Sequence, residues 1–213
     1  CDRPLAPIVS PRFDYVALQE LFEEYAPDHE LLTMLRWMTT SELADKIRDT
    51  GASNDGKLLH TRSDVINDKV TLLCEQGTLC RGRAKMYAVM FVVPKSDGTT
   101  SRLIMDCRAI NEIIKQVVEI PQMPLPYLPT LVQRILRRKF VWSVDAASMF
   151  YQFKLPRALA EYFGALIGGK RGAFIRVLLQ VLPMGVVFAP AFAQHLSNYV
   201  CKYVKHVAAT EGL

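Results

Sequence analysis

The sequence predicts an α+β fold, and three observations lead to that prediction. In the first 80 residues, apolar side chains recur at helical spacing in several separate segments. From residue 86 the pattern changes to β-branched and aromatic runs separated by turn residues, which is typical of antiparallel hairpins. A last segment returns to helical spacing and carries Pro190 near its start, where proline suits the first turn of a helix. The order predicts a helical lead-in followed by an antiparallel sheet with packed helices.

The N-terminal part begins with an extended leader over residues 1–12, which contains three prolines. Beyond it, helical spacing predicts helices over 14–25, 28–50 and 63–76. Asp14 is suited to be the N-cap of the first helix, and Gly77 is placed to end the third.

The second part begins with a predicted hairpin of two strands around the turn residues 96–98. The segment that follows, 106–114, fits either a strand end or a helix. Four prolines then predict an extended crossing over 120–129. The remaining elements are expected to be a short amphipathic helix (128–138), a buried strand (140–148), a hairpin about Gly168–Gly172 and a final helix (187–207).

Charge is distributed unevenly along the chain. Residues 1–80 contain 8 Lys/Arg and 14 Asp/Glu, a net −6, whereas residues 81–213 contain 18 and 7, a net +11. The basic part favours a polyanionic partner. No uninterrupted apolar stretch reaches transmembrane length and no secretory signal is visible, so we expect no membrane partner. The five scattered cysteines suggest free thiols in a reducing compartment, which predicts an intracellular protein of the nucleus or cytoplasm.

A few residues carry types and spacings that suit phosphate or metal chemistry. Asp145 ends a predicted buried strand, where a carboxylate is rigidly held and suits Mg²⁺, and Phe150 follows five residues later. Lys95 and Arg102 flank a predicted turn, so both cations lie near one hairpin tip and suit phosphate. Each residue taken alone has a plainer interpretation: a strand-end cap for Asp145, core packing for Phe150 and a solvated hairpin for the two cations.

The order of three blocks strengthens the chemical interpretation. They read VPKSDGTTSRLIMDCRAIN (93–111), SVDAASMFYQF (143–153) and LPMG (182–185). Together they resemble the fingers and palm of a reverse transcriptase, most nearly those of retroelements of the long-terminal-repeat or tyrosine-recombinase type. The resemblance covers about residues 80–205.

The resemblance implies an RNA-directed DNA polymerase, with template–primer and dNTP as partners and Mg²⁺ (or Mn²⁺) as cofactor. It assigns metal binding and catalysis to Asp145, with the backbone carbonyl of Ala146 as a further metal ligand. Nucleotide binding falls to Lys95 and Arg102 at the triphosphate, Phe150 under the sugar, and Met184 and Gly185. Met184 stands where many relatives carry Gln or Phe. Nucleic-acid contacts or structural roles fall to Arg108, Asn111 and Gln152.

One part of the family pattern is missing. The paired aspartates of the second catalytic motif do not occur in the 213 residues. We therefore expect a helical extension (1–80) and a fingers/palm unit (81–213) that stops before that motif and has little or no activity by itself. Two alternatives remain, a non-catalytic nucleic-acid-binding relic and a protein-interaction domain. Phe150 and the fingers motif argue against a third, an RNA-dependent RNA polymerase.

Overall fold

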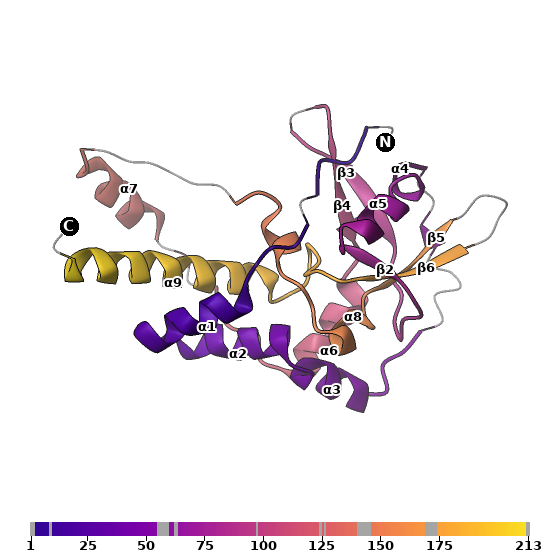
Figure 1. Cartoon of the computed structure of the whole chain (residues 1–213), viewed down its shortest axis with the longest axis horizontal. Coiled ribbons are helices and arrows are strands. Elements are labelled where there is room, and N and C mark those ends of the chain that lie inside the picture. The colour runs from indigo at the N-terminus through magenta and orange to yellow at the C-terminus, as the bar shows by residue number, and fades with distance from the viewer. Residues whose placement is uncertain are drawn as a thin grey trace.

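The fold was analysed in a computed structural model of the chain. It describes residues 3–8, 10–54, 60–61 (backbone only), 64–96, 98–123, 125, 127–139, 146–168 and 174–211. Helices and strands are both abundant, and the predicted α+β class is confirmed (Figure 1).

The N-terminal helices are α1 (Tyr15–Glu24), α2 (His29–Thr39) and α3 (Glu42–Asp49). Asp14 caps α1 as predicted, because its side chain accepts bonds from two backbone N–H groups. The single helix predicted over 28–50 is wrong, since it is divided between α2 and α3. Thr40 adopts an extended backbone there, and its hydroxyl donates to Arg36 O and accepts from Glu42 N. Threonine side chains that bond the backbone in this way compete with a continuing helix.

The predicted helix over 63–76 is also interrupted. The structure has α4 (Asp64–Asn67) and α5 (Val70–Glu75), separated by a turn at 68–69. Gly77 ends α5 with φ +73°, the left-handed conformation that glycine tolerates best.

The predicted basic hairpin is formed by β3 (Met90–Pro94) and β4 (Ser101–Met105), which pair antiparallel with Val93 opposite Arg102. Strand β3 starts four residues later than expected. The ambiguous segment after β4 is helical, α6 (Arg108–Val117).

A second sheet has the order β1–β5–β6–β2. The predicted hairpin about Gly168–Gly172 forms its centre, with β5 (Gly164–Gly168) antiparallel to β6 (Phe174–Leu179); residues 169–173 lie outside the described part of the chain. Strand β2 (Leu79–Arg81) is antiparallel to β6, whereas β1 (His60–Thr61) runs parallel to β5. Among the described strands of this sheet, the expected antiparallel pairing is found for β5, β6 and β2, whereas the short edge strand β1 is parallel.

Two short helices precede β5 in the sequence: η1, a 3₁₀ helix (Met149–Gln152), and α8 (Arg157–Ala160). The strand predicted over 140–148 cannot be compared along most of its length, because 140–145 lie outside the described residues. Of its last residues, 147 and 148 form a turn and 146 is in no regular element, so the predicted strand does not extend over them.

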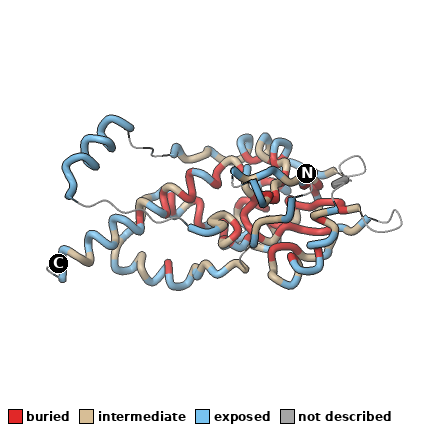
Figure 2. Tube along the Cα trace, turned by 90° about the horizontal axis from the view of Figure 1, so that it is seen from above, coloured by how far each residue is buried: buried red, intermediate tan, exposed pale blue. Residues whose placement is uncertain are grey.

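The final helix, α9 (Ala189–Thr210), lies beside α1 and α2 in Figure 1, and its first half is buried against the rest of the molecule in Figure 2. Three rings link the start of α1, the segment after η1 and α9. The ring centroid of Phe153 lies 4.7 Å from that of Phe13, just before α1, and 5.0 Å from that of Phe192, in edge-to-face contacts. Tyr199 of α9 donates to Leu21 O and is close enough to bond Tyr25 O. The acidic N-terminal helices are thus packed on the C-terminal helix.

Helix α7 (Leu128–Leu136) stands apart from the body in both views, and no residue in it is buried (Figures 1 and 2). The predicted short helix is confirmed. Among the described helices, none combines the length and apolar character needed to cross a membrane.

Candidate functional site

A cavity of about 270 Å³ lies beside the turn end of the β3–β4 hairpin. Its wall includes five of the predicted site residues, drawn from three separate blocks of sequence: Lys95, Arg102, Ala146, Phe150 and Met184. The hairpin, the start of η1 and the turn before α9 therefore meet at one place.

The hairpin contributes two cations to this cavity. Lys95 follows β3, where its backbone N–H donates to Thr100 O at 2.8 Å, and Arg102 lies on β4. Within the described residues, neither side chain takes part in an ion pair. Two positive groups beside one cavity, without a described carboxylate to neutralise them, make a site suited to a polyanion.

Phe150 is held in the cavity wall by η1. Ser148 precedes this 3₁₀ helix with φ +50°, and it is the one described non-glycine residue with positive φ. Such a backbone costs free energy and is found preferentially at functional sites. Tyr151, which follows Phe150, is buried and donates a short hydrogen bond to Leu103 O. This bond ties the Phe150 segment to the residue after Arg102.

Met184 lies on a turn that is fixed from the opposite side. The Asn111 amide donates to Gly185 O at 2.8 Å and accepts from Val187 N at 2.9 Å. Gly185 has φ +109°, which L side chains rarely adopt, so glycine is required there. Gly185 does not itself line the cavity. Asn111 thus acts here as a structural clamp on the turn that carries Met184.

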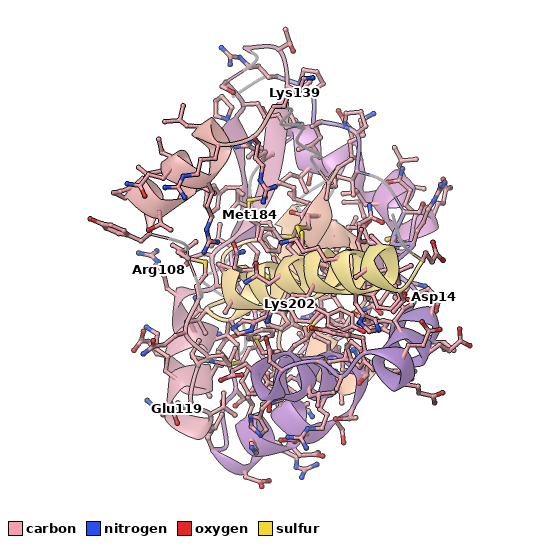
Figure 3. All side chains as sticks on the ribbon, turned by 90° about the vertical axis from the view of Figure 1, so that its left-hand side faces the viewer. Asp14, Arg108, Glu119, Lys139, Met184 and Lys202 are labelled. Atoms are coloured by element: carbon pink, nitrogen blue, oxygen red, sulfur yellow. The ribbon has the colours of Figure 1, made fainter. Side chains whose placement is uncertain are left out.

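Two further predicted residues, Arg108 and Gln152, also lie outside the cavity wall. Arg108, which is labelled in Figure 3, has a side chain that is 90% exposed. It forms a two-point pair with Asp106, at 2.9 Å from Nε to Oδ1 and 2.6 Å from Nη2 to Oδ2. Hydrogen bonding from Arg108 holds the pKa of Asp106 below its usual value, against the opposing effect of burial. Gln152 donates to Ala147 O at 3.3 Å and accepts from Arg12 N at 3.1 Å.

Asp145, the predicted metal ligand, lies outside the described residues, although Ala146 beside it lines the cavity. The described lining contains no carboxylate, so those residues alone do not form a Mg²⁺ site. Metal binding at this place depends on Asp145 and stays a prediction.

Several lining residues were not expected from the sequence. Three of them, Ala6, Pro7 and Ile8, come from the N-terminal leader, and Ser101 faces them from β4. Alternation along β4 signals which of its residues face the core, since Ser101, Leu103 and Met105 are buried. The leader shows no such alternation, so nothing in its sequence indicates that it lines the cavity.

A larger groove of about 810 Å³ lies between α2, the start of α3 and residues 117–123. Its cations are already neutralised: Arg36 lies 3.5 Å and Lys46 3.3 Å from the Glu42 carboxylate. The groove is therefore less suited to an anion than the smaller cavity.

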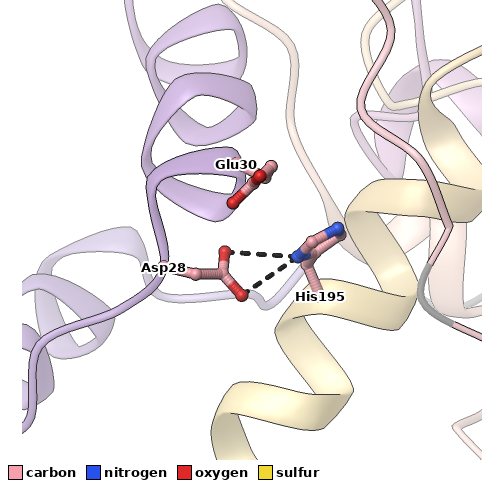
Figure 4. Close-up of side chains that lie close together, drawn as sticks. All are labelled: Asp28, Glu30 and His195. Carbon is pink, nitrogen blue, oxygen red and sulfur yellow. Dashed lines mark hydrogen bonds and ion pairs between the residues drawn. The ribbon is translucent and has the colours of Figure 1, made fainter.

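Asp28, Glu30 and His195 approach one another at the edge of this groove, with potential ligand atoms within 4.8 Å of each other (Figure 4). Both ring nitrogens of His195 already face oxygen acceptors, Asp28 Oδ2 at 3.1 Å and Gln122 O at 3.1 Å. A metal ion would have to displace one of these partners. We therefore interpret the cluster as a structural link between α2, α9 and the 120–123 segment.

Comparison with known proteins finds no matching family model. The chain is 22% identical over 156 residues to the Tf2-7 transposon polyprotein of Schizosaccharomyces pombe, covering 68% of this chain and 10% of that protein. It is 26% identical over 146 residues to the retrovirus-related Pol polyprotein from transposon gypsy of Drosophila melanogaster, covering 66% and 13%. The chain thus corresponds to a small part of these polyproteins, and the similarities support a retroelement origin.

Proposed function

We propose that the chain is the fingers and part of the palm of an RNA-directed DNA polymerase from a retroelement, and that the cavity beside the β3–β4 hairpin binds the incoming dNTP. The observation that carries the proposal is that Lys95, Arg102, Phe150 and Met184 line one cavity. These residues were selected from the order of sequence blocks, independently of their positions in space.

The proposed roles follow from the chemistry of each group. Lys95 acts as a point charge and Arg102 as a planar fork, and together they bind the triphosphate. The Phe150 ring lies under the sugar, where it excludes a 2′-hydroxyl. Met184 offers an apolar contact to the nucleotide, held in place through Asn111.

In the parent enzyme, the primer 3′-hydroxyl attacks the α-phosphorus of the dNTP and pyrophosphate leaves. Asp145 and the Ala146 carbonyl are the proposed ligands of Mg²⁺, with Mn²⁺ as an alternative; such ions stabilise the charge on the attacking and leaving oxygens. The two cations on the hairpin, Lys95 and Arg102, add to this electrostatic stabilisation by holding the triphosphate in place.

Nucleotide binding tests this proposal without requiring turnover. We expect the fluorescent analogue mant-dATP, with Mg²⁺, to bind saturably. Lys95→Ala combined with Arg102→Ala should weaken binding by about 100-fold or more, since two charge-assisted bonds contribute about 1.5–3 kcal/mol each and about 1.4 kcal/mol is tenfold. Lys202→Ala combined with Arg137→Ala is the matched control, because both residues are exposed and neither lines the cavity: Lys202 lies on α9 and Arg137 directly follows α7.

Equal loss in both double variants would contradict the proposal, since it would mean that net charge alone attracts the nucleotide. The alternative of a non-catalytic nucleic-acid-binding relic predicts a different result. In that case mant-dATP does not bind saturably, while a template–primer duplex binds with an affinity that falls steeply with salt.

A further inference from the structure

The N-terminal leader contacts the candidate nucleotide cavity directly. Residues 4–8, which we call the strap, lie against the outer edge of β4. Leu5 pairs in parallel with Ser101, Ala6 N donates to Ser101 O at 2.8 Å, and Ser101 N donates to Pro4 O at 2.8 Å. The following residues, Ala6, Pro7 and Ile8, form part of the cavity wall together with Lys95 and Arg102.

The strap leaves little room for a nucleotide. The cavity measures about 270 Å³ with the strap in place. Pockets that enclose a small-molecule ligand are usually about 300–1,000 Å³. The strap is also uncharged, so it contributes no counter-charge to the two cations. With the strap in place the cavity is thus just below the usual range, and displacement of the strap would enlarge it.

The strap is held in a way that permits displacement. Pro4 and Pro7 have no N–H, which limits the pairing with β4 to a short stretch. On its other side is a second cavity of about 270 Å³, lined by the strap and by α5 residues including Leu72, whose side chain is 43% exposed. Movement of the strap toward α5 would cover this exposed leucine and enlarge the nucleotide cavity.

A fixed point lies just beyond the strap. Phe13 N donates to Gln152 O, its ring packs on Phe153, and the Tyr15 hydroxyl donates to Lys154 O at 2.9 Å. These contacts anchor the chain that follows the strap to residues 152–154, directly after the segment that carries Phe150.

We propose that residues 4–8 are a displaceable strap that closes the nucleotide cavity, and that dNTP binding requires its release from Ser101. This inference rests on the proposed function, because it concerns access to the same site. The strap in this view regulates the affinity of the chain for dNTP.

The test compares two variants that each create a Pro-Pro pair in the leader. Ala6→Pro removes the N–H that bonds Ser101 O, whereas Ser10→Pro lies beyond the strap and serves as the control. Mant-dATP binding with Mg²⁺ is measured for both variants and the unmodified chain, and hydrogen exchange of the Ser101 amide reports whether the strap is closed. We expect Ala6→Pro to bind mant-dATP about tenfold more tightly than the unmodified chain. The substitution weakens the closed state, so a larger fraction of the molecules is open and able to bind. Adding nucleotide to the unmodified chain should speed exchange at Ser101.

The outcomes separate the two proposals. If Ala6→Pro speeds Ser101 exchange but binds mant-dATP no better than Ser10→Pro, the strap does not control access, and the nucleotide site itself stands. If the opened chain binds no nucleotide, the proposed function fails and the role of the strap fails with it. If Ala6→Pro does not fold, hydrogen exchange of the unmodified chain still tests the proposal. A Ser101 amide that exchanges freely, or that becomes more protected when nucleotide is added, would contradict the proposed role of the strap.

Discussion

At the scale of single residues, Phe150 is the side chain whose proposed role is most specific. It is half-buried in the cavity wall, and its segment is tied to β4 through Tyr151. In the proposed role, the ring rejects a ribonucleotide by steric overlap with its 2′-hydroxyl, a form of selection against the wrong partner.

We expect Phe150→Ala to bring the affinities for dATP and ATP closer together, with the change arising mainly from tighter ATP binding. The ratio of the two dissociation constants should fall by about tenfold or more, since removing a steric clash is worth roughly 1–3 kcal/mol. Competition against mant-dATP measures both constants. Phe91→Ala, a ring on β3 that does not line the cavity, is the control; the same fall in the ratio there would argue against the role of Phe150.

The Asp106–Arg108 pair gives a prediction about pH. The pKa of Asp106 is lowered in the folded chain, chiefly by the hydrogen bond from Arg108. The carboxylate therefore stabilises the fold above its unfolded pKa of about 4, and this contribution is lost as pH falls through the lower, folded pKa.

Asp106→Asn should accordingly lower the free energy of unfolding slightly at pH 7, and its difference from the unmodified chain should shrink below about pH 4, where the unfolded carboxyl becomes protonated. Urea unfolding at several pH values measures this. Glu112→Gln on α6 is a control for the loss of an exposed carboxylate. If the difference in the free energy of unfolding between Asp106→Asn and the unmodified chain grew in acid, the lowered pKa of Asp106 would be contradicted.

At the scale of elements, the link between α2 and α9 carries the clearest energetic expectation. Asp28 caps α2 by accepting from Leu31 N at 2.8 Å, and the same carboxylate faces Nδ1 of the buried His195. Its loss therefore removes a helix cap and also leaves a buried ring nitrogen without its partner.

We expect Asp28→Ala to destabilise the fold by more than Asp14→Ala, which removes only the cap of α1. The cap should account for about 0.5–2 kcal/mol in each variant, and the unpaired His195 nitrogen should add about 1–3 kcal/mol in Asp28→Ala. Chemical denaturation gives both values. Equal losses would mean that the contact with His195 contributes nothing to stability.

The sequence predicts local elements better than the contacts between them. Helix α1 and its Asp14 cap, the β3–β4 hairpin and helix α9 follow from short-range periodicity and turn residues. The break between α2 and α3 was missed because it depends on the Thr40 hydroxyl, which the apolar spacing does not register. The Asp28–His195 contact joins residues 167 positions apart, and neither residue has a local signal for it.

At the scale of the whole molecule, the two portions of opposite charge share one structure. Strand β1 lies in the acidic portion (1–80) and β2 at its end, and they are the two edge strands of the sheet whose centre is β5 and β6. Helix α2 packs against α9. The candidate cavity likewise combines the leader with the basic hairpin and η1. The sequence resemblance identified the residues on the basic side, whereas the part taken by the leader depends on tertiary pairing with Ser101.

The measurement that tests the central claim most directly is photo-crosslinking with 8-azido-dATP and Mg²⁺, with adducts located by mass spectrometry. The claim predicts saturable adducts within 146–152 or 182–187, next to Phe150 and Met184, that are lost when excess dATP is added and in the Lys95→Ala/Arg102→Ala variant. Adducts confined to the groove between α2 and residues 117–123, or adducts that dATP does not displace, would contradict it.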